Sequence, residues 1–235
     1  MTGMPTLVMI PGTLCDARIF WRPKRMLRGL AKVCVIDYGD MDRVEGWAQR
    51  LLQRLPARFS VAGFSLGGLW ALELLRLAPQ RVERIALIAS NAHGASPAGR
   101  RKSEGLRKLW HDRGPVEVAR HVKSAYFHHA RCRRRHSAMV LDMALGTSRK
   151  AAFAEFDFAA KRPDGHAALA HFAGPLLLIS GAQDRLCTSA MQRSMLLAQP
   201  AANWIELPRV GHFLPLEAPV RLGHALRNWM QCGPT

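Results

Sequence analysis

The sequence contains no apolar run long enough to cross a bilayer, because such a span needs about 20 consecutive apolar residues. The opening stretch MTGMPTLVMIPG also lacks the basic start and the small-residue cleavage site of a signal peptide, and Pro5 and Pro11 interrupt its apolar part. We therefore interpret this stretch as a strand and expect a cytoplasmic protein without a membrane span.

Closely spaced cysteines are also missing. The five cysteines are odd in number, lie far apart and include no Cys-x-x-Cys pair; they are Cys15, Cys34, Cys132, Cys187 and Cys232. Disulfide frameworks and cysteine-based zinc sites both depend on paired cysteines. The sequence therefore predicts free thiols and no metal site.

Acidic residues are scarce, with 17 Asp and Glu against 34 Lys and Arg and a formal net charge of +17. Such an excess attracts acidic partners: nucleic acid, an anionic membrane or an acidic protein. An arginine-rich composition spread over a solvated surface explains the same excess without any partner. The basic runs lack regularly interleaved aromatic residues and no DNA-binding motif is present, so we expect no specific nucleic-acid binding.

Short apolar runs take the place of long ones. They cover residues 6–10, 32–37, 59–63, 84–89, 176–180 and 204–207. Runs that are apolar throughout are typical of strands covered on both faces, which usually belong to parallel sheets. Segments with helical spacing lie between them, among them LGGLWALELLRLAP and APVRLGHALRNWM. This alternation predicts an α/β fold with a doubly wound, mostly parallel sheet of about six strands.

The stretch from 92 to 172 carries no strand signal. It has helical periodicity with breaks at Gly114-Pro115, Gly146 and Pro163-Asp164-Gly165. A segment of this length is too long for a plain loop in a compact domain. We predict a helical cap, residues 92–172, inserted into a core that is formed by residues 1–91 and 173–235.

The stretch VAGFSLGG places a serine between glycines. Residues 63–67, GFSLG, match the pattern G-x-S-x-G after a predicted strand and before a predicted helix. The turn in this motif leaves no room for side chains two residues before and after Ser65, which accounts for Gly63 and Gly67. It exposes the hydroxyl at a helix N-terminus, where free N–H groups favour developing negative charge. We predict that Ser65 is a nucleophile; the alternative is a glycine-rich turn with an incidental serine.

A serine nucleophile needs a base, and the base needs an acid that orients it. SGAQDRLCT supplies Asp184 after the fifth predicted strand, and VGHFLPLEAP supplies His212 after the sixth. Both follow the carboxyl ends of strands, where open α/β sheets place their sites. We predict Ser65, Asp184 and His212 as the catalytic residues. The alternatives are a turn-forming role for Asp184, a structural role for His212, and Asp157 or Asp164 as the acid.

Backbone N–H groups are expected to stabilise the oxyanion. One should belong to Leu66, which follows the nucleophile, and the other to the loop PGTLCD after the first strand. In that loop we choose Thr13, with Leu14 next; the alternative is that the loop is simply a turn. For the substrate pocket we predict Leu14 together with Phe64 and Phe213, because the two phenylalanines flank catalytic residues.

The sequence resembles a capped member of the α/β-hydrolase superfamily. The segments GFSLGG, GAQDRL and GHFLPLEAP carry the likeness, which covers the predicted core. Within the superfamily, the sequence is similar to carboxylesterases and to pimeloyl-carrier-protein methyl ester esterases. The resemblance implies hydrolysis of a small-molecule ester through an acyl-enzyme on Ser65, without a cofactor. Lactones, thioesters, carbon–carbon bonds and perhydrolysis remain open as reactions of the same triad. A ligand-binding member of the fold without turnover is the alternative from a different class.

One departure from the family pattern concerns the oxyanion loop. Many members carry His-Gly where this chain has Pro11-Gly12. Proline donates through neither a side chain nor an N–H group. The loop must therefore be held by another contact.

Positive charge is concentrated in the predicted cap, in GRRKSEGLRK and in RCRRR, Arg131–Arg135. A solvated helix face accounts for these runs without any partner. The resemblance to esterases that act on carrier-bound acyl chains implies a second interpretation, in which the cap docks an acidic carrier protein above the active site.

Overall fold

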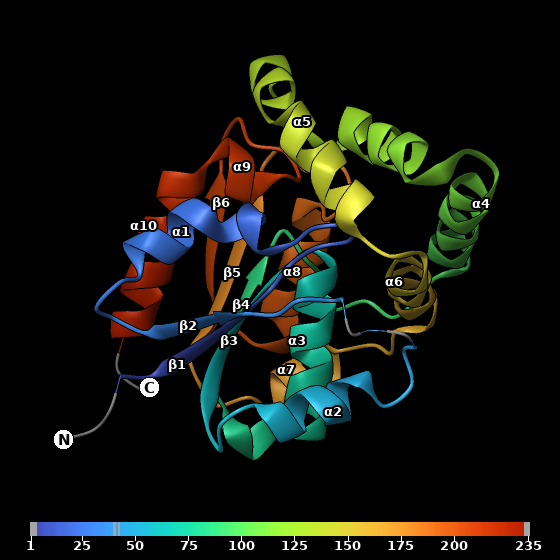
Figure 1. Ribbon diagram of the computed structural model, residues 1–235. Helices are drawn as coiled ribbons and strands as arrows, with labels where there is room; N and C mark the ends of the chain where they lie inside the picture. The colour runs from blue at the N-terminus through green and yellow to red at the C-terminus, as the bar shows by residue number, and fades with distance from the viewer. Residues whose placement is uncertain (1–3, 40, 42, 233–235) are drawn as a thin grey trace.

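A computed structural model describes residues 4–39, 41 and 43–232 (Figure 1). Six parallel strands form one sheet in the order β2-β1-β3-β4-β5-β6. The strands are β1 (Thr6–Ile10), β2 (Lys32–Val35), β3 (Phe59–Phe64), β4 (Val82–Ile88), β5 (Leu176–Gly181) and β6 (Asn203–Leu207). This confirms the predicted doubly wound parallel sheet.

Helices connect the strands. They are α1 (Trp21–Met26), α2 (Trp47–Arg54), α3 (Leu66–Leu77), α4 (Pro97–Tyr126), α5 (Ala130–Gly146), α6 (Arg149–Lys161), α7 (His166–Ala170), α8 (Ser189–Ala198), α9 (Leu214–Glu217) and α10 (Pro219–Gln231), with short 3-10 helices η1 (Ala17–Phe20) and η2 (Pro79–Arg81). No helix in these described ranges is both long and apolar enough to cross a membrane.

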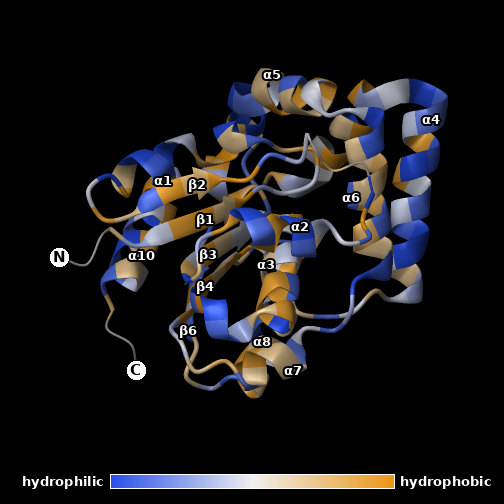
Figure 2. Cartoon of the chain, turned by 60° about the horizontal axis from the view of Figure 1, so that its bottom comes forward, coloured by the Kyte–Doolittle hydropathy of each residue, from blue (hydrophilic) through white to orange (hydrophobic). Residues whose placement is uncertain are grey.

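The four central strands β1, β3, β4 and β5 bury side chains on both faces, as their apolar sequences predict, whereas the edge strands β2 and β6 are partly exposed. In β1, Leu7 and Met9 point into one apolar cluster, while Val8 and Ile10 point into another, because successive side chains of a strand alternate. The first cluster includes side chains of α10, and the second includes side chains of α2, α3 and α8. Figure 2 shows β1 and β2 as largely apolar and α4 as largely hydrophilic.

The order of the strands determines which loops become neighbours. The chain runs from β1 to the edge strand β2 and then back across β1 to β3, so β1 and β3 pair directly, with Ile10 opposite Gly63. The loops that leave the carboxyl ends of these two strands therefore lie side by side. Ligands of open α/β sheets bind at such switch points.

Helices α4–α6 stand between β4 and β5 in the chain, and we call them the insert. Figure 1 shows them grouped together, apart from the helices that flank the sheet. The predicted breaks are present: Gly114 adopts φ 78° and ψ 179° ahead of Pro115, α5 ends at Gly146, and α6 ends just before Pro163. The positive φ of Gly114 is a conformation that glycine adopts without penalty.

Helix α6 joins the insert to the core. Phe158 stacks on Trp70 of α3, with ring centroids 3.5 Å apart and an interplanar angle of 9°. Phe158 and Trp70 belong to the second of the two apolar clusters described above, whereas Phe156, on the same helix, is buried in the first. The helix therefore contributes to both halves of the core, and its position depends on aromatic packing.

We expect Phe158→Ala to destabilise the protein by about 3–5 kcal/mol, because it removes a buried ring and leaves a cavity beside Trp70. Urea unfolding followed by circular dichroism measures the change. Leu197→Ala is the control, since Leu197 is 84% exposed and its truncation should change the stability by less than about 0.5 kcal/mol. Equal losses in the two variants would contradict this account of α6.

Candidate active site

Ser65 sits on a sharp turn between β3 and α3. Its backbone adopts φ 52° and ψ −114°, outside the helical and strand regions, which costs about 1–3 kcal/mol for a residue other than glycine. A Cβ atom on Gly63 would lie 2.2 Å from the Gly67 carbonyl oxygen, and one on Gly67 would lie 2.0 Å from the Ile10 carbonyl oxygen. Both positions therefore require glycine.

Two hydrogen bonds connect this turn to β4 and the residues that follow it. The Ser65 N–H donates to the Ile88 carbonyl oxygen at 2.9 Å, and the Ser90 hydroxyl donates to the Ser65 carbonyl oxygen at 2.8 Å. Both partners lie at the carboxyl end of β4 or just beyond it. The neighbouring strand thus stabilises the strained residue.

The structure brings together the three residues predicted as catalytic. His212 Nε2 lies 2.8 Å from Ser65 Oγ, and His212 Nδ1 lies 2.8 Å from Asp184 Oδ2. The histidine is 2% exposed and Asp184 is 5% exposed. Because an ionised carboxylate only accepts hydrogen bonds, Nδ1 carries the imidazole proton and Nε2 is left to accept from the serine hydroxyl.

Asp184 is held by its own backbone neighbours. Its Oδ1 accepts the N–H groups of Leu186 at 2.8 Å and Cys187 at 2.9 Å, which leaves Oδ2 for His212. These two hydrogen bonds therefore fix the orientation of the carboxylate independently of its contact with His212.

Residues of the insert and of α9 hold the His212 loop. The His212 N–H donates to the Tyr126 carbonyl oxygen at 2.8 Å, and the Tyr126 ring meets the imidazole edge-on with centroids 4.9 Å apart. Glu217 accepts the Gly211 N–H at 3.0 Å and two N–H groups at the α4–α5 junction. The sequence predicted neither contact: Tyr126 was a candidate only for the apolar pocket, and Glu217 lies in the segment GHFLPLEAP without any pattern that indicates its role.

The loop after β1 is fixed at two points. The Tyr38 hydroxyl donates to the Pro11 carbonyl oxygen at 2.8 Å. The Leu14 N–H donates to Glu155 Oε2 at 2.7 Å, and Leu14 adopts a positive φ of 55°. These two contacts hold the loop in place, although Pro11 has neither an N–H group nor a side-chain donor.

Two N–H groups near Ser65 are free. Among the residues that the structure describes, neither the Thr13 N–H nor the Leu66 N–H has a hydrogen-bond acceptor. The Leu14 N–H is engaged by Glu155, so of the two loop residues considered from the sequence only Thr13 has a free donor. The Leu66 N–H is free because Leu66 begins α3.

The three predicted pocket residues lie in one apolar cluster. Leu14, Phe64 and Phe213 are 4%, 1% and 3% exposed. The Phe64 ring lies 5.5 Å from the imidazole of His212 and 6.1 Å from the ring of Phe213, measured between centroids. The phenylalanines form an apolar wall beside His212, and their contact with a substrate stays a prediction.

Cys187 lies beside Asp184, and its thiol is held in the neutral form, which is a poor nucleophile. Burial raises the pKa of its thiol to about 12, and the nearby Asp184 carboxylate contributes to the rise. Cys187, Asp184 and His212 have ligand atoms within 4.8 Å of one another, a spacing that suits a metal ion. The thiol is neutral and the other two groups bond to each other, an arrangement that fits proton transfer better than metal ligation.

A second cluster with metal-ligand spacing comprises His93, Asp164 and His166. Both imidazoles lie 3.1 Å from the Ser194 hydroxyl, and His166 Nδ1 lies 2.9 Å from Asp164 Oδ1. His93 lies where the chain enters the insert and His166 where it leaves it. The cluster thus ties both connections to α8 through hydrogen bonds.

The comparisons with known proteins agree with this fold. A model described as the alpha/beta hydrolase family matches residues 7–225. The pimeloyl-[acyl-carrier protein] methyl ester esterase of Nitrosomonas europaea is 42% identical over 50 residues, which cover 21% of this chain and 20% of that protein. The match therefore spans about a fifth of the relative's length.

Two solved structures are similar over nearly the whole chain. The thermophilic esterase from Thermogutta terrifontis has a TM-score of 0.84 and 21% identity, covering 98% of this chain and 90% of that one. The enol-lactonase from Burkholderia xenovorans has a TM-score of 0.85 and 20% identity, covering 98% and 93%. Identities this low show the fold alone. The family match, however, extends over nearly the full sequence, and this chain belongs to the alpha/beta hydrolase family.

Proposed function

We propose that this protein hydrolyses carboxylic esters, with Ser65 as nucleophile, His212 as general base and acid, and Asp184 as the group that orients the histidine. One observation carries the proposal: the His212 ring lies 2.8 Å from Ser65 Oγ through one nitrogen and 2.8 Å from Asp184 Oδ2 through the other. That geometry allows the imidazole to take a proton from the hydroxyl while the carboxylate stabilises the resulting cation.

The reaction has two halves. In the first, His212 Nε2 takes the hydroxyl proton as Ser65 Oγ attacks the ester carbonyl carbon, and the tetrahedral intermediate then expels the alcohol, which leaves with that proton. In the second, water gives a proton to His212 and attacks the acyl carbon, and Ser65 regains a proton as the carboxylic acid leaves. His212 carries every proton, so the mechanism needs no cofactor.

The oxyanion of both intermediates is assigned to the N–H groups of Leu66 and Thr13. Both are free among the described residues, and the pairing of β1 with β3 places their loops side by side. Donors fixed in advance stabilise developing negative charge without any rearrangement during the reaction.

We further propose that residues 92–172 act as a cap over a core of residues 1–91 and 173–235. The contacts of the insert with the site support this role: Tyr126 bonds to the His212 loop, and Glu155 bonds to the loop after β1. Lactones, thioesters and carbon–carbon bonds remain open as substrates of the same residues. Covalent labelling with a fluorophosphonate distinguishes an enzyme that uses Ser65 on any of these substrates, which should be labelled, from a ligand-binding protein without turnover, which should not.

A second candidate function is hydrolysis of acyl groups tethered to an acidic carrier protein. Arg131, Arg134 and Arg135 are exposed on α5, and none of them forms an ion pair within the described part of the chain. Another cation, Lys102, lies 3.1 Å from the hydroxyl of Tyr126, whose ring meets His212. The short match to a pimeloyl-[acyl-carrier protein] methyl ester esterase points in the same direction.

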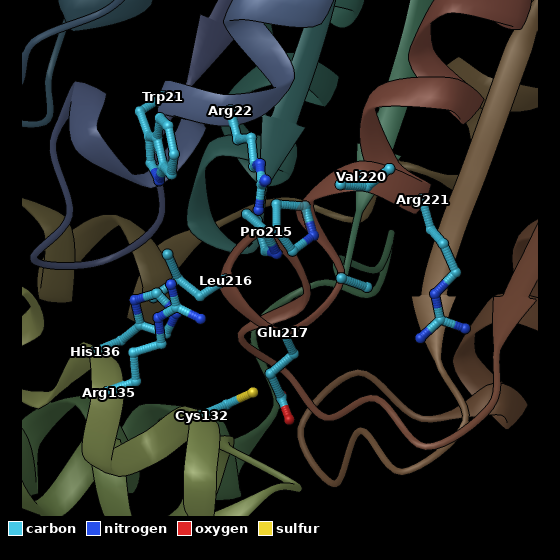
Figure 3. Close-up of a pocket in the computed structure, with 12 residues that line it drawn as sticks. Trp21, Arg22, Cys132, Arg135, His136, Pro215, Leu216, Glu217, Val220 and Arg221 are labelled. Atoms are coloured by element: carbon cyan, nitrogen blue, oxygen red, sulfur yellow. The ribbon is translucent and has the colours of Figure 1, made fainter.

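One of these arginines, Arg135, lines a surface pocket of about 350 Å³ (Figure 3). The pocket lies between α1, α5 and the α9–α10 segment; its lining includes Trp21, Arg22, Arg135, His136 and Arg221. Trp21 is 45% exposed. An exposed indole among several cations suits an acidic protein surface that carries an apolar residue.

Ser65→Ala should lower kcat/KM for p-nitrophenyl esters by about 10³- to 10⁶-fold, because it removes the atom that attacks the carbonyl. Rates with acetate to dodecanoate esters, together with circular dichroism, measure the effect on activity and on folding. Ser137→Ala on α5 is the matched control and should leave the rates unchanged. Turnover by Ser65→Ala at the wild-type rate would exclude the assignment.

Asp184→Asn should lower kcat by about 10⁴-fold with little change in KM. The amide oxygen replaces Oδ1 as acceptor for the Leu186 and Cys187 N–H groups, so the NH₂ group must face His212 Nδ1. The imidazole then carries its proton on Nε2 and cannot accept the Ser65 proton. Steady-state kinetics measure the change, and a loss of less than tenfold would contradict this role for Asp184.

The double variant Arg134→Glu/Arg135→Glu tests the carrier hypothesis. We expect kcat/KM for a carrier-bound acyl ester to fall by about tenfold or more at low salt, because charge reversal at an interface slows association. The rate with the free ester should not change, since neither arginine contacts the triad. Equal responses of the two substrates to the substitutions and to salt would count against carrier docking.

A further inference from the structure

Glu155 is a buried carboxyl group that the proposed reaction does not use. It lies on α6 of the insert, is 1% exposed, and accepts the Leu14 N–H through Oε2 at 2.7 Å. The two residues are 141 positions apart in the sequence. Its other oxygen, Oε1, is buried without a hydrogen-bond partner among the described residues. A buried polar group in this situation calls for an explanation.

The partner of this carboxyl is a strained residue. Leu14 adopts a φ of 55°, a region that residues other than glycine rarely occupy. The loop begins with Pro11-Gly12 and so has no side-chain donor at its start. Tyr38 holds the Pro11 carbonyl from the core side. Glu155 holds the other end of the loop from the insert.

Burial favours the protonated, neutral form of this carboxyl. Burial raises its pKa from 4.5 to about 8, although the bond from the Leu14 N–H opposes the rise. The titratable groups that face it are Cys15 and Tyr38, and burial raises the pKa of both, so neither is charged. No cation in the described chain compensates a negative charge here. The carbonyl oxygen of the protonated group still accepts the Leu14 N–H.

We propose that Glu155 is a positioning residue, which fixes the Leu14 peptide so that the adjacent Thr13 N–H faces the oxyanion only while α6 is packed on the core. The proposal rests on the ester hydrolysis proposed above. The peptide that carries the Leu14 N–H follows Thr13 directly, so fixing it restricts the rotation of the donor residue. The position of the insert and the completeness of the oxyanion hole are thereby linked.

Two substitutions of similar size test this role. Glu155→Gln keeps an oxygen acceptor, and Glu155→Leu removes it. Glu155→Leu should lower kcat by about 10- to 100-fold with little change in KM, since loss of an oxyanion donor costs about 10²–10³ in rate and the loop retains the Tyr38 contact. Glu155→Gln should restore kcat to within about threefold of wild type. Asp157→Asn, which removes an exposed ion pair on the same helix, is the control and should change nothing.

Amide hydrogen exchange separates failure of this inference from failure of the proposed function. The Leu14 N–H should exchange slowly in wild type and in Glu155→Gln and fast in Glu155→Leu. A wild type that hydrolyses esters, with Glu155→Leu unchanged in kcat, would overturn the inference and leave the function standing. A wild type without ester turnover would overturn the function. In that case, exchange of the Leu14 N–H would decide the inference. Equal exchange rates in both Glu155 variants would overturn it, whereas loss of protection in Glu155→Leu alone would support Glu155 as the residue that positions the loop.

The neutral state of Glu155 predicts a pH dependence of stability. Because the folded protein binds this proton more tightly than the unfolded chain, stability should decrease as the pH rises from about 4.5 to about 8 and level off above that. Glu155→Gln cannot ionise and should lack this decrease. The difference in melting temperature between wild type and Glu155→Gln should therefore change across this window, whereas a constant difference would show that the carboxyl is ionised throughout.

Discussion

Backbone crowding where β1, β3 and α3 meet constrains the turn that carries Ser65 and the loop that lies next to it. The start of α3 approaches the end of β1 so closely that a Cβ atom on Gly67 would lie 2.0 Å from the Ile10 carbonyl oxygen. Ser65 adopts its strained conformation in the turn just before this contact, and the loop after β1 begins at the strand end that α3 approaches. Because all the strands are parallel, the loops after β5 and β6 end at the same edge, where Asp184 and His212 complete the group.

The strands, the Ser65 turn and the grouping of three distant residues could be predicted because each depends on a local pattern. The six apolar runs correspond to the six strands, with ends displaced by no more than two residues. Ser65 is marked by the glycines around it, while Asp184 and His212 are marked by their positions after strands. Because parallel strands end at the same edge of the sheet, the predicted sheet is enough to place these three residues close together.

The contacts that hold the loops could not be predicted, because they arise from the packing of helices onto distant loops. Glu155 meets a backbone group 141 positions away, and Glu217 meets the α4–α5 junction 89 positions away. No local pattern records such a pairing. Glu155 lies four residues after Ala151 and three before Phe158, on the face of α6 that is buried. A carboxyl group on a buried helix face was the one sequence feature that could have indicated a role for this residue. In this acid-poor chain, both carboxyl groups bind backbone N–H groups and connect the insert to the core.

The central claim is that Ser65 carries the acyl group during turnover. Rapid quenching of the protein with a p-nitrophenyl ester, followed by intact-mass and peptide-level mass spectrometry, tests it most directly. The account predicts one acyl group per chain, located on the peptide that contains Ser65, formed together with a burst of p-nitrophenol and lost as hydrolysis proceeds. Ester turnover without an acylated intermediate, or with the acyl group on another residue, would contradict it.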